Sequence, residues 1–207
     1  MERFVVITMY CSEQLYDDLS EADVVCVQNL TNTNFQKITQ HIKLQGFTEV
    51  HTAPKSMDPN RVWEGIYSKH KFTKKGYISF AKSKEGRGLT WVELSTTPQI
   101  HIVTSEFESK GEGSTSRKAQ TEELAVTFGN KSIIFAGSTN IASWQKLNID
   151  DISDKWIDAW LEGGTSSNEY TDGVDRLDRI WYTSTNTPLL EKFEVLDDRV
   201  VRCSITF

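Results

Sequence analysis

Three small polar residues follow an unbroken apolar run in the segment 131–140, which reads KSIIFAGSTN. Their hydroxyl and amide groups can surround a phosphate or orient a water molecule. The apolar run 133–136 is typical of a strand covered on both faces, so Ser138, Thr139 and Asn140 are expected at the carboxyl end of that strand. In α/β sheets, sites are commonly built at this end. The alternative is an ordinary turn, because Gly, Ser, Thr and Asn also favour turns.

The first half of the chain alternates strand and helix patterns. It predicts strands over residues 4–9, 23–27, 47–52, 62–67, 77–81, 90–94 and 100–105. A short helix capped by Ser12 is expected between the first two strands. A second helix is expected to bury Phe35, Ile38 and Ile42 and to end at Gly46. The four strands from residue 62 onward are expected to form an antiparallel meander.

The second half is expected to place the central strand, 132–136, after a helix. That helix is predicted over 117–126, capped by Ser116 and with Leu124 and Val126 turned inward. The closing elements are a short helix or turn at 156–161, a strand at 177–182, and a strand or strand pair at 195–207. No linker divides the chain, so one domain spanning residues 1–207 is expected.

The composition is that of an ordinary globular protein, with 38% hydrophobic, 11% aromatic and 25% charged residues. No apolar run reaches the ~18 residues of a membrane span, so no membrane association is expected, and the chain is expected in the cytoplasm or nucleus. Cys11, Cys26 and Cys203 lack metal-ligand spacing and are expected to be buried, reduced thiols. The formal net charge of −6 disfavours broad attraction to nucleic acid.

One segment departs from this acidic average, because Glu85 is the only acidic residue between residues 69 and 87. A basic face in this segment would bind phosphate or nucleic acid, and the alternative is a set of solvated turns. The residues that would form the face are Lys69, Lys71, Lys74, Lys75, Lys82, Lys84 and Arg87.

Five segments resemble, in family order, the motifs of the endonuclease/exonuclease/phosphatase superfamily, nearest its tyrosyl-DNA phosphodiesterase branch. They are DVVCVQNL (23–30), HIVTSEFES (101–109) with Arg117 and Gln120 after it, IIFAGSTN (133–140), IDAW (157–160) and RLDRIWY (176–182). The resemblance covers nearly the whole chain. It implies a deoxyribonuclease-I-like fold of class α/β (α+β), in which two packed mixed β-sheets form a sandwich flanked by helices. It also implies metal-assisted attack of water on a phosphodiester.

The residues that this resemblance assigns to catalysis have mostly changed type. Such chemistry needs a carboxylate to hold a divalent cation and a base to activate water. Asn29 stands where the family has its metal-binding glutamate, and Ser138 stands where it has a catalytic aspartate. The family's first asparagine and its two histidines are replaced by Tyr10, Glu106 and Arg199. The residues that keep the family's type are Asn140, Asp178, Asp198 and Arg117.

These replacements predict a catalytically inactive relative that needs no metal or other cofactor and acts as a binding or scaffold protein, with a protein as its partner. One alternative is a phosphodiesterase with a relocated metal site formed by Glu106, Asp178 and Asp198. Another is a nucleic-acid-binding module that uses the basic segment 69–87. Because Glu106 and Arg199 carry opposite charges at positions that face the cleft, an ion pair between them is also expected.

Overall fold

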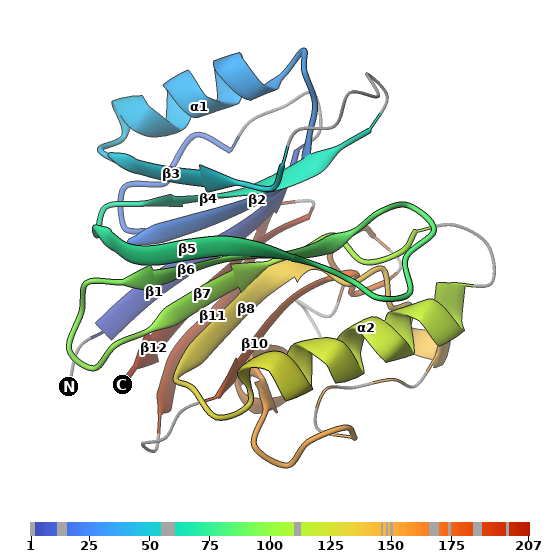
Figure 1. The fold of residues 1–207 in the computed structure, drawn as a ribbon. Coiled ribbons are helices and arrows are strands. Elements are labelled where there is room, and N and C mark those ends of the chain that lie inside the picture. The colour runs from blue at the N-terminus through green and yellow to red at the C-terminus, as the bar shows by residue number, and fades with distance from the viewer. Residues whose placement is uncertain are drawn as a thin grey trace.

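In the computed structural model, the chain forms two six-stranded β-sheets that pack face to face, with helices on their outer surfaces (Figure 1). The structure describes residues 3–207 apart from 12–15, 55–60, 110–112, 146, 148, 150, 166–169, 174, 184–187 and 198. Among the described residues, no helix is long and apolar enough to cross a membrane. The predicted sandwich of two mixed sheets flanked by helices is confirmed.

The first sheet brings the N-terminal and C-terminal strands side by side. Its order is β11 (Leu189–Asp197), β12 (Val200–Thr206), β1 (Arg3–Tyr10), β2 (Val24–Leu30), β4 (Trp63–Ser68) and β3 (Glu49–Thr52). β1 and β2 run parallel, and the other neighbouring strands are antiparallel. Helix α1 (Phe35–Leu44) covers the outer face through Ile38 and Ile42. Gly46 follows with a φ of +93°, which residues with a Cβ rarely adopt, so the helix ends there as predicted.

The second sheet contains the central strand. Its order is β5 (Phe72–Ser79), β6 (Gly88–Leu94), β7 (His101–Thr104), β8 (Ile133–Ser138), β10 (Asp178–Thr183) and β9 (Ile157–Asp158). β7 and β8 run parallel, and the other neighbours are antiparallel. Helix α2 (Gly113–Phe128) covers the outer face, where Leu124 and Phe128 pack with Phe135 and Trp181. The shorter elements are η1 (Ser143–Gln145) and α3 (Ala159–Gly163).

The interior between the two sheets is apolar over most of its length and becomes polar near one end of the strands. There, Thr8 Oγ1 donates to Gln28 Oε1 at 3.1 Å, and Gln28 Nε2 donates to Thr104 Oγ1 at 2.9 Å. Gln28 Nε2 also reaches the carbonyl oxygen of Ala136 at 3.5 Å. The carboxyl ends of β2 and β8 therefore lie at the same edge of the sandwich, above this buried polar layer.

Some predictions about individual elements are wrong. β4 pairs with β2 and β3 in the first sheet, so the antiparallel meander contains only β5, β6 and β7. Helix α2 begins at Gly113 instead of residue 117, and Val126 is 85% exposed although Leu124 is buried. Residues two positions apart point in very different directions on a helix, so these two side chains cannot both face the sheet. The helix capped by Ser12 lies partly outside the described residues, and 16–19 contain no helix.

Candidate functional site

The site that the sequence predicted lies where the carboxyl ends of β1, β2 and β8 meet the turn between β11 and β12. The backbone N–H of Tyr10 donates to the carbonyl of Arg199 at 3.1 Å, which joins the end of β1 to that turn. Asn29, Asn140 and Arg199 have φ angles of 60°, 51° and 56°, and they are the non-glycine residues with positive φ in the described part of the chain. Strained backbone of this kind is often concentrated at functional sites.

Arg199 fills the centre of this site. Its Nε and Nη2 donate to the two carboxylate oxygens of Asp178 at 2.9 and 3.0 Å, and Nη2 also donates to Ser138 Oγ at 2.7 Å. The guanidinium carbon lies 3.5 Å from the centroid of the Tyr10 ring, which is a cation–π contact. The structure thus brings together four predicted site residues, Tyr10, Ser138, Asp178 and Arg199, and bonds them to one another.

The charges in this group depend on each other. Asp178 is fully buried, and burial raises the pKa of its carboxyl, while the hydrogen bond and charge of Arg199 act against that rise. Burial alone would lower the pKa of Arg199, but Asp178, together with Tyr10 and Glu106, outweighs burial and leaves that pKa above its ordinary value. The guanidinium therefore stays charged, and it supplies the positive charge that a buried Asp178 carboxylate needs.

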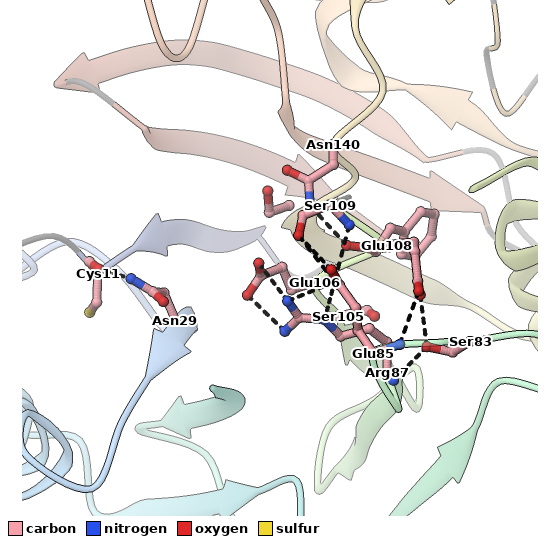
Figure 2. A network of polar contacts seen from close by, with 12 residues as sticks. Cys11, Asn29, Ser83, Glu85, Arg87, Ser105, Glu106, Glu108, Ser109 and Asn140 are labelled. Atoms are coloured by element: carbon pink, nitrogen blue, oxygen red, sulfur yellow. Dashed lines mark hydrogen bonds and ion pairs between the residues drawn. The ribbon is translucent and has the colours of Figure 1, made fainter. Parts of the chain in front are cut away.

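Glu106 forms a second ion pair with Arg87, which lies in the turn between β5 and β6 (Figure 2). Arg87 Nη2 and Nη1 donate to the two oxygens of Glu106 at 3.0 and 3.1 Å, which is a bidentate arrangement. Arg87 also donates from Nε and Nη2 to Glu85 Oε2 at 3.2 Å. Burial raises the pKa of Glu106, and the charges of Arg87 and Arg199 oppose the rise.

The predicted ion pair between Glu106 and Arg199 is therefore wrong. The two charges act on each other through space, but Glu106 bonds to Arg87 and Arg199 bonds to Asp178. The prediction placed Arg87 on a solvent-facing basic segment, whereas its side chain is 9% exposed and points into the sandwich edge. Arg87, from the neighbouring hairpin, takes the bidentate edge of Glu106 that the prediction had assigned to Arg199.

Glu108 anchors that hairpin turn over the site. Its carboxylate accepts hydrogen bonds from the backbone N–H groups of Lys84 and Glu85, both at 2.9 Å, and from Ser83 Oγ at 2.8 Å (Figure 2). Arg117 and Gln120 of helix α2 hold Glu108 through its backbone, with Arg117 Nη1 to the Glu108 carbonyl at 2.9 Å and the Glu108 N–H to Gln120 Oε1 at 3.0 Å. Arg117 and Gln120 thus position this turn.

Asn29 and Asn140 use their amide groups to hold backbone at the rim of the site. Asn29 Nδ2 donates to the Cys11 carbonyl at 2.7 Å, and Figure 2 shows the side chain turned toward Cys11. Asn140 Nδ2 donates to the Phe107 carbonyl at 2.8 Å. Each of these asparagines itself has a positive φ, and its amide stabilises the bent chain segment there.

Sequence reasoning missed three candidate residues, Glu64, Glu85 and Glu108. It also missed that Arg87 is buried and pairs with Glu106. Glu108 lies inside the HIVTSEFES segment, and its position there was the available signal. The sequence contained no such signal for Glu64, because it is a single acidic residue within a strand pattern and belongs to no motif. It is buried between the sheets, where Thr90 Oγ1 donates to it at 3.1 Å, and burial raises the pKa of its carboxyl to about 8.

The lysines of the segment 69–87 do not gather at one place. Lys69 Nζ donates to the Ser20 carbonyl at 2.7 Å, and Lys74 Nζ bonds to Glu93 at 3.2 Å. Lys71 precedes β5, whereas Lys82 and Lys84 follow it, in the turn that Glu108 holds. The basic segment therefore runs along an edge strand, and its two ends lie at opposite ends of the second sheet.

The residues at this site do not fit a divalent cation. Both oxygens of Asp178 accept from Arg199, both oxygens of Glu106 accept from Arg87, and Asn29 offers a neutral amide. In the described part of the chain, no three His, Cys, Asp or Glu residues are arranged to hold a metal ion. Asp198, which the sequence also suggested, lies outside the described residues.

Comparisons with known proteins agree with this architecture. No protein-family model matches the sequence, and no curated protein matches it. The structure of D. rerio TDP2 complexed with single-strand DNA product superposes with a TM-score of 0.80 at 17% identity, covering 100% of both chains. Truncated Caenorhabditis elegans TDP2 gives 0.75 at 17% identity, covering 99% of this chain and 98% of that one.

A third solved structure, an endonuclease/exonuclease/phosphatase from Bacteroides vulgatus, superposes with a TM-score of 0.78 at 13% identity and covers 100% of both chains. The three structures share the two-sheet sandwich described above. The chain thus has the deoxyribonuclease-I-like fold, the two-sheet sandwich seen in these structures of TDP2 and of an endonuclease/exonuclease/phosphatase.

Proposed function

We propose that this chain is a catalytically inactive relative of the metal-dependent phosphodiesterases that share its fold, and that it acts by binding a protein partner. The observation that carries the proposal is the Arg199 guanidinium, which occupies both oxygens of Asp178 and the hydroxyl of Ser138. A positive side chain bonded there takes the acidic groups that metal-assisted hydrolysis would need. The site is closed by its own residues.

The second ion pair supports the same conclusion. A general base must have a lone pair free to take a proton from water. Glu106 stands where the resemblance has a histidine, and both of its oxygens accept from the buried Arg87. Burial keeps the pKa of Glu106 above its ordinary value despite Arg87, so the obstacle is geometric: the edge of the carboxylate that would take the proton is bound to the guanidinium. Metal binding and water activation are thus both disfavoured.

Charge favours a protein over a nucleic acid as the partner. Nucleic-acid affinity rises with the number of cations that reach phosphates. Arg87 and Arg199 are bonded to internal carboxylates, and the exposed lysines are spread along β5 in a chain with a formal net charge of −6. D. rerio TDP2 was captured with a single-strand DNA product, whereas Arg87 and Arg199 of this chain are already bonded to carboxylates.

The deciding experiment measures hydrolysis of 5′-phosphotyrosyl DNA with Mg²⁺ or Mn²⁺, alongside calorimetric titration of each ion. We expect no turnover above that of the matched Glu106→Gln variant and no saturable metal binding. Metal-dependent turnover that Glu106→Gln abolishes would overturn the proposal in favour of a relocated metal site. Binding of single-stranded DNA that weakens steeply between 50 and 200 mM salt would favour the nucleic-acid alternative instead.

A further inference from the structure

The Arg199 guanidinium is surrounded by a set of partners that match its shape. Asp178 meets one edge of the planar group with two parallel hydrogen bonds of 2.9 and 3.0 Å. Ser138 Oγ accepts from Nη2 at 2.7 Å, and the Tyr10 ring lies against the flat face at 3.5 Å. We call Tyr10, Ser138 and Asp178 the guanidinium cage. Edge, corner and face of one planar cation are each contacted by a different side chain.

The parts of the cage come from the ends of three strands that belong to the two sheets. Tyr10 ends β1, Ser138 ends β8 and Asp178 begins β10, and β8 and β10 pair directly through Ser138 and Asp178. Arg199 enters from the turn between β11 and β12. The cage is therefore built on the sheet ends, and its occupant arrives on a turn.

The chemistry of the cage suits a guanidinium better than other cations. A carboxylate edge and an aromatic face recognise a flat, weakly hydrated group that offers parallel N–H donors. An ammonium presents no flat face and no parallel donors. A divalent metal prefers several oxygen ligands, and the ring of Tyr10 gives none from its face.

We propose that the cage is a guanidinium-binding site that the chain fills with its own Arg199. The proposal deepens the proposed function, on which it rests, by naming which side chain occupies the candidate site and which chemical class competes for its place. Removal of the Arg199 side chain leaves a preformed cavity with a buried carboxylate, and a free guanidinium compound restores the missing contacts.

The test uses the Arg199→Gly variant, because glycine tolerates the φ of 56° at this position. The melting temperature of the full chain is followed with 0–20 mM methylguanidinium chloride, and sodium chloride keeps the ionic strength constant. We expect a saturable rise of about 3–6 °C at ten times the dissociation constant. Methylammonium and Mg²⁺ at the same concentrations are expected to give less than a third of that rise.

Matched controls separate the cage from general effects of the ion. Wild type should not respond, because its cage is full. Arg202→Ala removes an arginine that bonds to Glu194 and Glu21, which lie at 25% and 69% exposure, and it should not respond either. The double variant Arg199→Gly/Asp178→Asn keeps the cavity but removes its charge, and it should lose at least three quarters of the response.

Equal rises in all variants, no rise in Arg199→Gly, or an equal rise with methylammonium would overturn the proposal. If Arg199→Gly does not fold alone, refolding in methylguanidinium should recover it selectively, and failure to recover it would also overturn the proposal. The readout is stability, so it is independent of hydrolysis. Turnover in the wild type would refute the proposed function and leave this result standing.

Discussion

Two aspartates in the second sheet, Asp158 and Asp178, are buried, and each is paired with arginine. The two differ in how many groups bond to the carboxylate and in where the arginines come from. Asp158 ends β9 and accepts four hydrogen bonds, from Arg176 at 2.7 Å, Arg179 at 3.4 Å, the indole of Trp181 at 3.0 Å and the backbone N–H of Trp160 at 3.0 Å. Asp178 begins β10, and the positive charge that pairs with its carboxylate comes from Arg199. In both groups an arginine lies over an aromatic ring.

The difference is in where the arginines come from. Arg176 and Arg179 flank the start of β10, so the network around Asp158 joins neighbouring segments and caps helix α3. Arg199 comes from the C-terminal hairpin and is 18% exposed at the edge of the sandwich. Burial and pairing are alike in the two groups, so neither identifies a site. Of the two, Asp178 is the one at the converging strand ends, where the candidate site was expected.

The largest effect is expected when the Asp158 network is broken. Asp158→Ala leaves two buried arginines without their carboxylate and removes the N-terminal cap of α3, so we expect a loss of about 3–5 kcal/mol in the free energy of unfolding. Urea unfolding at pH 7 measures it. Asp158→Asn keeps an oxygen for the cap and should cost less. A loss below about 1 kcal/mol for Asp158→Ala would show that this network contributes little to the stability of the fold.

The second test concerns the ion pair between Arg87 and Glu106 at the candidate site. In a double-mutant cycle of Arg87→Ala and Glu106→Ala, we expect a coupling of about 2–3 kcal/mol, because the two groups form a buried bidentate pair. The matched cycle of Arg199→Ala and Glu106→Ala should give less than about 0.5 kcal/mol, since these residues share no hydrogen bond. If the second coupling exceeds the first, Glu106 pairs across the cleft with Arg199, and Arg87 is not its main partner.

Much of the fold followed from local patterns. The run 133–136 and the motif segments predicted β8, β2 and β10, because strands covered on both faces are continuously apolar. Sheet membership did not follow. The pattern of β4 resembles that of its successors, and its pairing with β2 instead of β5 depends on long-range contacts that no local pattern contains. Val126 was wrongly turned inward because it lies two residues after Leu124 and so cannot share its buried face of the helix.

The site was predictable in its location and less so in its bonds. The resemblance placed Tyr10, Ser138, Asp178 and Arg199 together, and the structure bonds them to one another. It could not reveal that Arg87 turns inward, because a lone arginine in a lysine-rich turn has the sequence pattern of a solvent-exposed residue. Which carboxylate a buried arginine bonds to depends on distances of a few ångströms between turns. These distances are set by the packing of the two sheets, and no local sequence pattern contains them.

Glu64 tests whether an acid can remain ionised in this interior without an arginine bonded to it. Burial raises its pKa to about 8, so the folded state holds a proton that the unfolded chain releases near its ordinary pKa. This stability contribution is complete below about pH 4 and is lost as the pH rises toward 8. Glu64→Gln keeps the bond from Thr90 without titrating, so it should be more stable than wild type by about 3–5 kcal/mol at pH 9 and equal to it at pH 4. Parallel urea titrations in which the difference between the two proteins does not widen from pH 4 to pH 9 would contradict this.

The smallest effect concerns the aromatic rings beneath the two arginines. The Arg199 guanidinium carbon lies 3.5 Å from the Tyr10 ring centroid, and that of Arg176 lies 4.3 Å from the Trp160 centroid. Cation–π contacts contribute about 0.5–1 kcal/mol at accessible sites and more when desolvated. Tyr10→Leu should therefore cost about 0.5–1 kcal/mol, whereas Tyr10→Phe, which keeps the ring, should be nearly neutral.

A cycle between Tyr10→Leu and Arg199→Gly isolates this contact from packing, and the equivalent cycle between Trp160→Leu and Arg176→Ala does the same beside Asp158. We expect the Trp160 coupling to be the larger, because indole has the strongest attraction for cations and Arg176 is 10% exposed against 18% for Arg199. A larger Tyr10 coupling would show that the shorter distance outweighs ring type and burial. The cleft would then hold its arginine more tightly than the structural network holds its own.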